Sequence, residues 1–189
     1  MPVPLRRGFK SDANWHAIKA REELGLLPHA ALCPRNLAIH LGYTVVELGS
    51  YIAHDASAVH YLQSAAGQKE FSAITIYCEV ARLIIHNDAH HPHRQAANIA
   101  HELAHGLLIH KPSALQDRNG ARLYNKEQED EANWLGPALL ISDEAALHIV
   151  ETGQSHAEAR RTYGVSDELL EMRLRVTAAH LRVARRRAA

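Results

Sequence analysis

The chain has 189 residues and 47% of them are hydrophobic, which suits one domain with a packed core and excludes a disordered tail. Its formal net charge is zero, so no overall field attracts nucleic acid, although eight arginines against three acidic residues make residues 160–189 basic. Two cysteines without a CxxC pair, and an N-terminus without an apolar core, predict a cytoplasmic protein that neither is secreted nor spans a membrane.

A first helix is predicted over residues 12–24. Asp12 is a residue type that caps helices, because its carboxylate accepts a hydrogen bond from a free backbone N–H of the first turn. Trp15, Ile18 and Leu24 recur at roughly helical spacing, so they are predicted to line the buried face.

A short helix and a strand are predicted next. Pro34 suits the first position of a helix, and Gly42 suits the position just after its end. The β-branched content of residues 43–48 predicts a strand. Residues 56–65 are ambiguous, and the spacing of their apolar residues favours a helix.

Two apolar segments, residues 71–77 and 82–86, are predicted to form a β-hairpin because only a short connection separates them. If the 82–86 strand has an exposed edge, it could bind an extended peptide by strand addition. The histidine-rich segment 87–93 that follows is irregular and contains Pro92. It is therefore predicted to be a loop leading into a helix, not a second metal site.

The predicted helix over residues 94–110 contains the pattern His-Glu-x-x-His. Residues four apart share one face of a helix, so His101 and His105 can offer ring nitrogens to one ion. Glu102 is close enough to reach a water on that ion. Two neutral histidines, a third ligand and an open water position make a catalytic zinc site.

A third ligand is predicted in the helix over residues 124–141. Glu129 and Asn133 are four apart, so Glu129 can bind the metal while Asn133 supports a ligand by hydrogen bonding. The alternative for this acidic run is a solvated helix face. Pro137 lacks the N–H that would bond the carbonyl of Asn133, so a bend is predicted beside these residues.

The C-terminal part is predicted to be helical over residues 143–151, 155–163 and 166–186. The last two helices, joined by Gly164 and capped by Ser166, look like a helix-turn-helix, which leaves a DNA-binding regulator as an alternative. An ordinary helical hairpin is favoured, because Glu168 and Glu171 would face the phosphates. Specific binding to nucleic acid is therefore not expected.

The strand, the His101–His105 motif, the Glu129–Asn133 segment and the apolar run 139–142 occur in an order that resembles the ImmA/IrrE family of zinc metallopeptidases. The resemblance covers most of residues 12–150. Ala104 replaces the usual glycine of that family's motif, which should matter little. The segments Trp134–Pro137 and Ile141–Ser142 also differ from the family's usual residues, which affects the expected shape of the neighbouring pocket.

The resemblance implies roles for five residues. His101, His105 and Glu129 would bind Zn²⁺, Glu102 would be the catalytic base, and Glu131 would be the fallback ligand if the helix register differs. Members of the family are cytosolic bacterial proteases, and many regulate transcription by cleaving a helix-turn-helix repressor. No oxyanion-stabilising residue follows from the sequence, and Tyr124 is a weak candidate.

Together these patterns predict an α+β fold of zincin-like type, with a small sheet packed on the active-site helix and a mostly helical C-terminal half. Residues 1–152 would form the metallopeptidase domain, and residues 153–189 a helical extension packed on it. The predicted function is a zinc-dependent metalloendopeptidase that makes limited cuts in a partner protein. The other alternative is a toxin or adaptor that keeps the fold without hydrolysis, against which the intact ligands and base argue.

Overall fold

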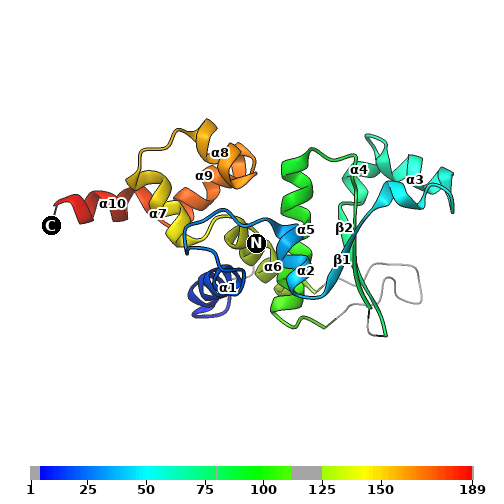
Figure 1. The fold of residues 1–189 in the computed structure, drawn as a ribbon, viewed down its shortest axis with the longest axis horizontal. Helices are drawn as coiled ribbons and strands as arrows, with labels where there is room; N and C mark the ends of the chain where they lie inside the picture. The colour runs from blue at the N-terminus through cyan, green and yellow to red at the C-terminus, as the bar shows by residue number, and fades with distance from the viewer. Residues whose placement is uncertain (1–4, 80, 112–124, 189) are drawn as a thin grey trace.

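The computed structural model describes residues 5–79, 81–111 and 125–188 of the chain. Its N-terminal helices are α1 (Phe9–Glu23), α2 (Pro34–His40), α3 (Ala56–Gln63) and α4 (Gly67–Glu70), with a 3₁₀ turn η1 over Leu48–Tyr51. The strands are β1 (Tyr43–Glu47), β2 (Ala73–Cys78) and β3 (Ala81–His86). The later helices are α5 (Pro92–Leu107), α6 (Lys126–Leu140), α7 (Asp143–Glu151), α8 (His156–Tyr163), α9 (Asp167–Val176) and α10 (Ala179–Ala188). The α+β class with a mostly helical C-terminal half is therefore confirmed (Figure 1).

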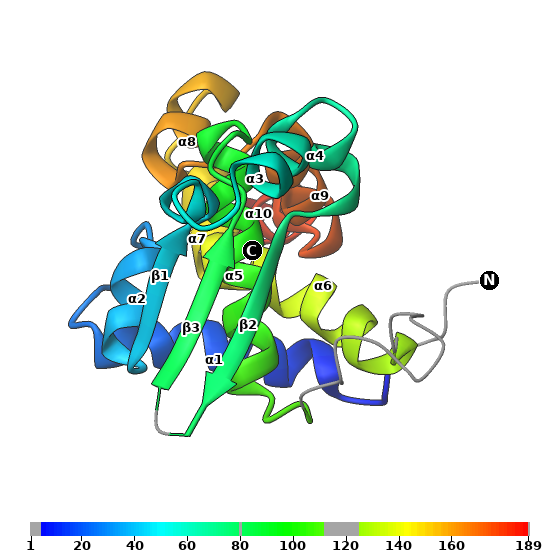
Figure 2. The same ribbon diagram turned by 90° about the vertical axis from the view of Figure 1, so that its right-hand side faces the viewer.

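The three strands form one sheet in the order β1–β3–β2 (Figure 2). β3 pairs antiparallel with β2, which confirms the predicted hairpin, and parallel with β1. The prediction that the 82–86 strand has an exposed edge is wrong, because β1 occupies that edge. Among the described strands, β2 pairs only with β3, so its other edge is open to an added strand.

α5 lies at the centre of the molecule and contacts both β2 and β3 on one side and α6 on the other. Ile99 and Leu103 of α5 are buried in one apolar cluster with Ile84 of β3 and Leu135 of α6. Figure 2 shows α5 behind the sheet. The His-Glu-x-x-His pattern is thus carried by a helix that packs between a sheet and another helix.

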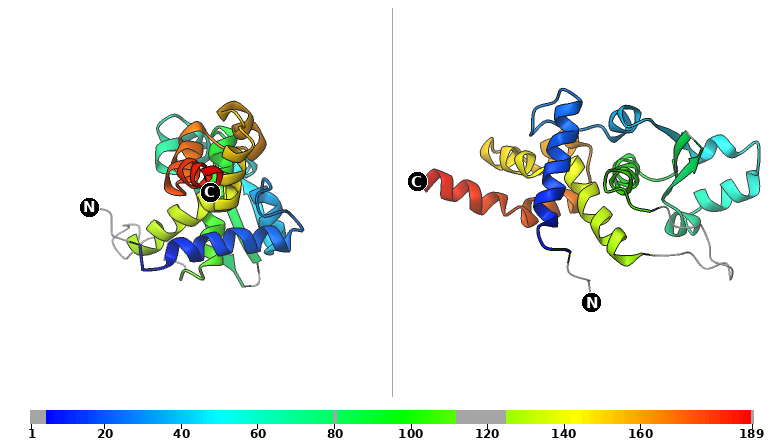
Figure 3. Two further views of the ribbon diagram at one scale, coloured as in Figure 1. Left: turned by 90° about the vertical axis from the view of Figure 1, so that its left-hand side faces the viewer. Right: turned by 90° about the horizontal axis from the view of Figure 1, so that it is seen from below.

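The first helix begins earlier than predicted and buries a different face. Gly8, in the left-handed conformation, is its cap, while Asp12 lies in the first turn. Trp15 is 59% exposed, so the prediction that it lines the buried face is wrong. The small residues Ala13 and Ala17 are fully buried instead, because α1 lies close alongside α6 (Figure 3, right).

The predicted helix over residues 166–186 is two helices, α9 and α10. The chain breaks at Ala178, whose φ of 50° is outside the helical region. Thr177 ends α9 by turning its hydroxyl to the carbonyl of Arg173, at 2.8 Å. Gly164 ends α8 and Ser166 caps α9, which confirms the predicted stop and cap between these two helices.

The C-terminal helices share a second apolar cluster with α5 and with the end of α6. Ala100 of α5 is buried there together with Leu140, Tyr163 and Leu174. The side chain of Arg173 is 2% exposed and donates to the carbonyl of Ile141, at 2.8 Å. The division of the chain at residue 152 stays a prediction. Within residues 5–79, 81–111 and 125–188, no helix is both long and apolar enough to cross a membrane.

Candidate metal centre

α5 begins at Pro92, two residues earlier than predicted. His91 caps it, because its ring Nδ1 accepts a hydrogen bond from the backbone N–H of His93 at 3.2 Å, and Pro92 occupies the first helical position. α6 crosses α5 at Gly136, where an added Cβ would lie 3.1 Å from the Cα of His101. The missing side chain lets the two helices come close enough to share a site.

Three ligand-type side chains meet at this crossing. His101 and His105 come from α5 and Glu129 from α6, and one ligand atom of each lies within 4.8 Å of the others. The Nε2 atoms of His101 and His105 are 3.1 Å apart. They lie 3.4 Å and 3.6 Å, respectively, from the Glu129 carboxylate. Two imidazole nitrogens and one carboxylate oxygen are a donor set that fits Zn²⁺.

Burial keeps His105 in the form that binds a metal. Desolvation first, and then the neighbouring His101, lower the pKa of His105 to about 4, while Glu129 acts in the opposite direction. The imidazole is therefore neutral near pH 7, and a metal ion does not have to displace a proton from it.

Glu102 faces the sheet. The hydroxyl of Thr75 on β2 donates a hydrogen bond of 2.6 Å to the Glu102 carboxylate. Two residues further along β2, burial first and then the hydrogen bond between its hydroxyl and that of Tyr43 raise the pKa of Tyr77, so this phenol stays protonated. The candidate base is thus bonded to β2, the strand that has one unpaired edge among the described strands.

Comparison with family models matches residues 58–175 to the IrrE N-terminal-like domain of peptidase family M78. The chain belongs to this family. No curated protein and no solved structure matches the chain. The matched span begins later than the resemblance in the sequence and runs on through most of α9, and it contains β2, β3, α5 and α6. A peptidase domain implies a protein substrate.

The other two predicted site residues of the M78 domain lie outside the three-residue cluster. The Glu131 carboxylate contacts the ring of His110 at 3.1 Å and the guanidinium of Arg6 at 3.0 Å. Asn133 is exposed on α6, and its supporting role stays a prediction. Tyr124 and the segment that joins α5 to α6 lie outside the described residues.

Sequence reasoning missed two residues at this site, Thr75 and His110. Thr75 could be found only by knowing which strand lies beside α5. His110 follows the second motif histidine by five residues, a spacing with no ligand signal of its own in a continuous helix. Its ring Nδ1 lies 2.9 Å from the Nδ1 of His105.

A second group of ligand-type side chains lies on α8 and α9. His156, Asp167 and Glu171 also have ligand atoms within 4.8 Å of one another. His156 and Asp167 are about half exposed and lie 3.4 Å apart, and the guanidinium of Arg160 lies 3.9 Å from Asp167. The positive charge of Arg160 disfavours a metal ion there, so this group is an ion-pair cluster.

Proposed function

We propose that this chain is a zinc-dependent metalloendopeptidase of zincin-like arrangement. The observation that carries the proposal is the convergence of His101, His105 and Glu129 within 4.8 Å, with Glu102 next to the first ligand on the same helix. When bound, zinc would polarise the scissile carbonyl and acidify the attacking water.

Glu102 takes the proton from the attacking water and passes it to the leaving amine. The Thr75 hydroxyl holds this carboxylate in place through the 2.6 Å hydrogen bond. His105 is neutral because it is buried, so it serves as a ligand and not as a proton donor. The hydrogen bond from Thr75 thus suits Glu102 to the role of base, and burial suits His105 to the role of ligand.

The substrate segment lies along β2. Among the described strands, β2 has no partner on its second edge, and its Thr75 contacts the proposed base, so an extended peptide added to that edge would pass Glu102. The segment that is cut must leave its own backbone groups free, which restricts cleavage to chains that can become extended. The enzyme therefore makes limited cuts, and the family resemblance points to a helix-turn-helix repressor of the same cell as the partner.

A DNA-binding function draws little support from the C-terminal helices. Arg173 and Arg182 both bind Asp143, at 3.0 Å and 3.3 Å, and Arg186 binds Glu151 at 2.6 Å. These arginines neutralise acidic groups of the chain itself. The proposed function is therefore hydrolysis of protein and not recognition of nucleic acid.

Metal analysis of the purified chain tests the site. The wild type should hold about one zinc per chain, and His101→Ala should lose it. Glu102→Gln should keep the metal and the fold but lose hydrolysis, because only the proton acceptor is removed.

Co-expression with a candidate repressor tests the substrate. The wild type should give one discrete fragment and Glu102→Gln none, while unfolded casein survives under the same conditions. Indiscriminate digestion by the wild type, or the same fragment from the variant, would refute the proposal.

A further inference from the structure

The C-terminal end of α5 folds back onto its own last turn. The backbone N–H of Ile109 donates to the carbonyl of Gly106 at 3.1 Å, and that of His110 donates to the carbonyl of His105 at 3.0 Å. This pair of bonds is the Schellman motif, in which the second residue beyond the helix end packs against the residue five positions earlier. Here those two residues are His110 and His105, so an imidazole pair replaces the usual apolar contact.

The turn that produces this contact is strained. Ile109 has a φ of 54° and is 87% exposed. The left-handed conformation costs a residue with a Cβ about 1–2 kcal/mol and is rarest for β-branched side chains such as isoleucine. Its exposed side chain adds little packing in return, and strained backbone of this kind clusters at functional sites.

A chain of hydrogen bonds runs outward from His105. Its Nδ1 lies 2.9 Å from the Nδ1 of His110, whose Nε2 lies 3.1 Å from the Glu131 carboxylate. The other oxygen of that carboxylate accepts a bond from Arg6 at 3.0 Å. The His110 side chain is only 7% exposed, so water does not compete freely for these contacts.

The donors and acceptors of this chain fit only one arrangement of protons when His105 binds a metal through Nε2. Nδ1 of His105 then carries a proton and donates a hydrogen bond to Nδ1 of His110. Nε2 of His110 also carries a proton and donates a hydrogen bond to the Glu131 carboxylate, which can only accept. This arrangement leaves Nε2 of His105 unprotonated, and that atom faces His101 and Glu129.

We propose that His110 is a positioning residue for the metal ligand His105 and that Glu131 orients His110. The proposal rests on the proposed function, since it takes His105 to be a ligand. His110 fixes the tautomer and the ring plane of His105, and the negative charge of Glu131 makes the ligand nitrogen more basic. Glu131 thereby acts behind the metal site and is not itself a ligand.

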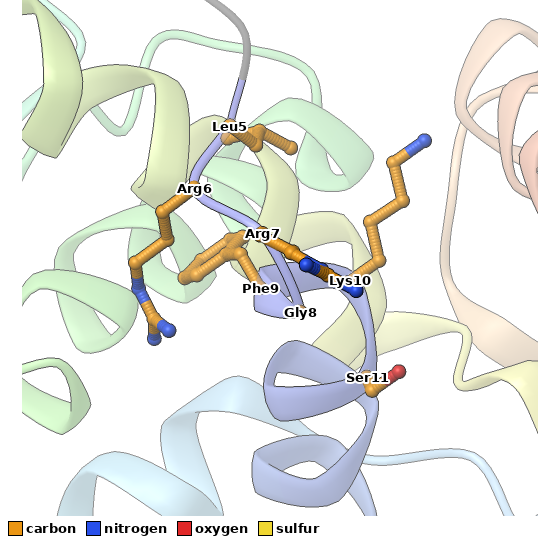
Figure 4. Close-up of a pocket in the computed structure, with 7 residues that line it drawn as sticks. All are labelled: Leu5, Arg6, Arg7, Gly8, Phe9, Lys10 and Ser11. Carbon is orange, nitrogen blue, oxygen red and sulfur yellow. The ribbon is translucent and has the colours of Figure 1, made fainter.

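Arg6 anchors the outer end of this chain from the N-terminal segment. Figure 4 shows its side chain leaving that segment on the side opposite to Lys10. Arg6 also binds Asp12 of α1 at 2.7 Å, so the guanidinium is held from two directions. The first turn of α1 is in this way connected to the metal ligand on α5.

Two substitutions of one residue test the proposal. His110→Leu replaces the imidazole with an apolar side chain of similar bulk and removes the acceptor for His105. His110→Asn keeps an acceptor oxygen near the position of Nδ1. In competition with a chelator, His110→Leu should bind zinc about tenfold to a hundredfold more weakly than the wild type, and His110→Asn should recover most of that affinity.

Nitrogen NMR of the zinc-loaded wild type gives a readout that needs no variant. It should find the proton of His105 on Nδ1 and that of His110 on Nε2, and this supports the proposal even if His110→Leu fails to fold. Wild-type affinity in His110→Leu, equal weakening in His110→Asn, or coordination through Nδ1 of His105 would overturn the proposal. If the wild type binds and cleaves normally in those cases, the proposed function survives. If His105→Ala keeps its zinc, both fail.

Discussion

The contact between Gly106 and Tyr43 is predicted to limit what the end of the active-site helix tolerates. An added Cβ at position 106 would overlap the Tyr43 hydroxyl and lie 3.1 Å from the Cζ of that ring. Tyr43 is 6% exposed, so its ring has little room to move. Alanine favours a helix over glycine by about 1 kcal/mol, while overpacking costs about 1–3 kcal/mol. Gly106→Ala should therefore destabilise the fold by up to about 2 kcal/mol.

A double-mutant cycle isolates this overlap from other effects. Tyr43→Phe removes the overlapping oxygen, so Gly106→Ala should cost about 1–2 kcal/mol less in that background. Tyr77→Phe is the matched control, because it removes the same 3.3 Å hydrogen bond between the two hydroxyls and leaves the overlap in place. Urea denaturation measures all the variants. Coupling below about 0.5 kcal/mol with Tyr43→Phe, or equal coupling with Tyr77→Phe, would refute the reasoning.

Four further predictions concern the ligands, the core, the response to pH and DNA. Glu129→Ala should lower zinc affinity more than Glu131→Ala, because Glu129 alone joins both motif histidines; the reverse order in chelator competition would show that the assumed ligand is wrong. Arg21 is fully buried and donates to the carbonyls of Ala17, Ala30 and Leu140. Arg21→Met should therefore cost about 2–4 kcal/mol of unfolding free energy in urea, and a neutral outcome would mean that these bonds add nothing. Burial, and then the nearby Arg35, lower the pKa of His86 below its ordinary 6.5, so the unfolded chain takes up the proton first. The stability that depends on neutral His86 is thus complete above pH 6.5 and is lost as the pH falls below 6.5. His86→Gln should flatten the curve of unfolding free energy against pH in this range. An unchanged slope in the variant would count against the prediction. The full chain should bind duplex DNA weakly and without sequence preference in fluorescence anisotropy, and tight selective binding lost on deleting residues 155–189 would contradict this.

The sequence predicted the elements whose signals are local. The spacing of His101 and His105, the glycine after α2 and the serine cap of α9 each act within one turn of chain, so they could be read in order. The position of β1 could not be read this way. Its pairing with β3 joins residues that are about forty positions apart, and it decides which edge of the sheet remains open. The unpaired edge was therefore predicted on the wrong strand.

The face of α1 was mispredicted for a related reason. Large apolar residues usually mark the buried side of a helix, but the middle of the buried face of α1, which lies close to α6, is made of Ala13, Ala17 and Ala20. The spacing of Trp15 with Ile18 and Leu24 therefore indicated the wrong buried face. At the candidate metal centre, the end of α5 lacks the glycine that normally indicates a Schellman motif. Ile109 adopts the left-handed conformation in its place. Without that signal, nothing indicated that His110 turns back to His105.

The support of the metal centre extends beyond the part of the chain that matches the peptidase family. The matched span begins at residue 58, yet Tyr43 packs against Gly106 and Arg6 binds Glu131. Tyr43 contacts the last turn of α5 directly, and Arg6 is linked to its end through Glu131 of α6 and His110. The three residues of the candidate metal cluster and Glu102 lie within the matched span. The groups that support the end of α5 from outside that span come from the segment before α1 and from β1, so we predict that the chain before residue 58 helps to hold the candidate site.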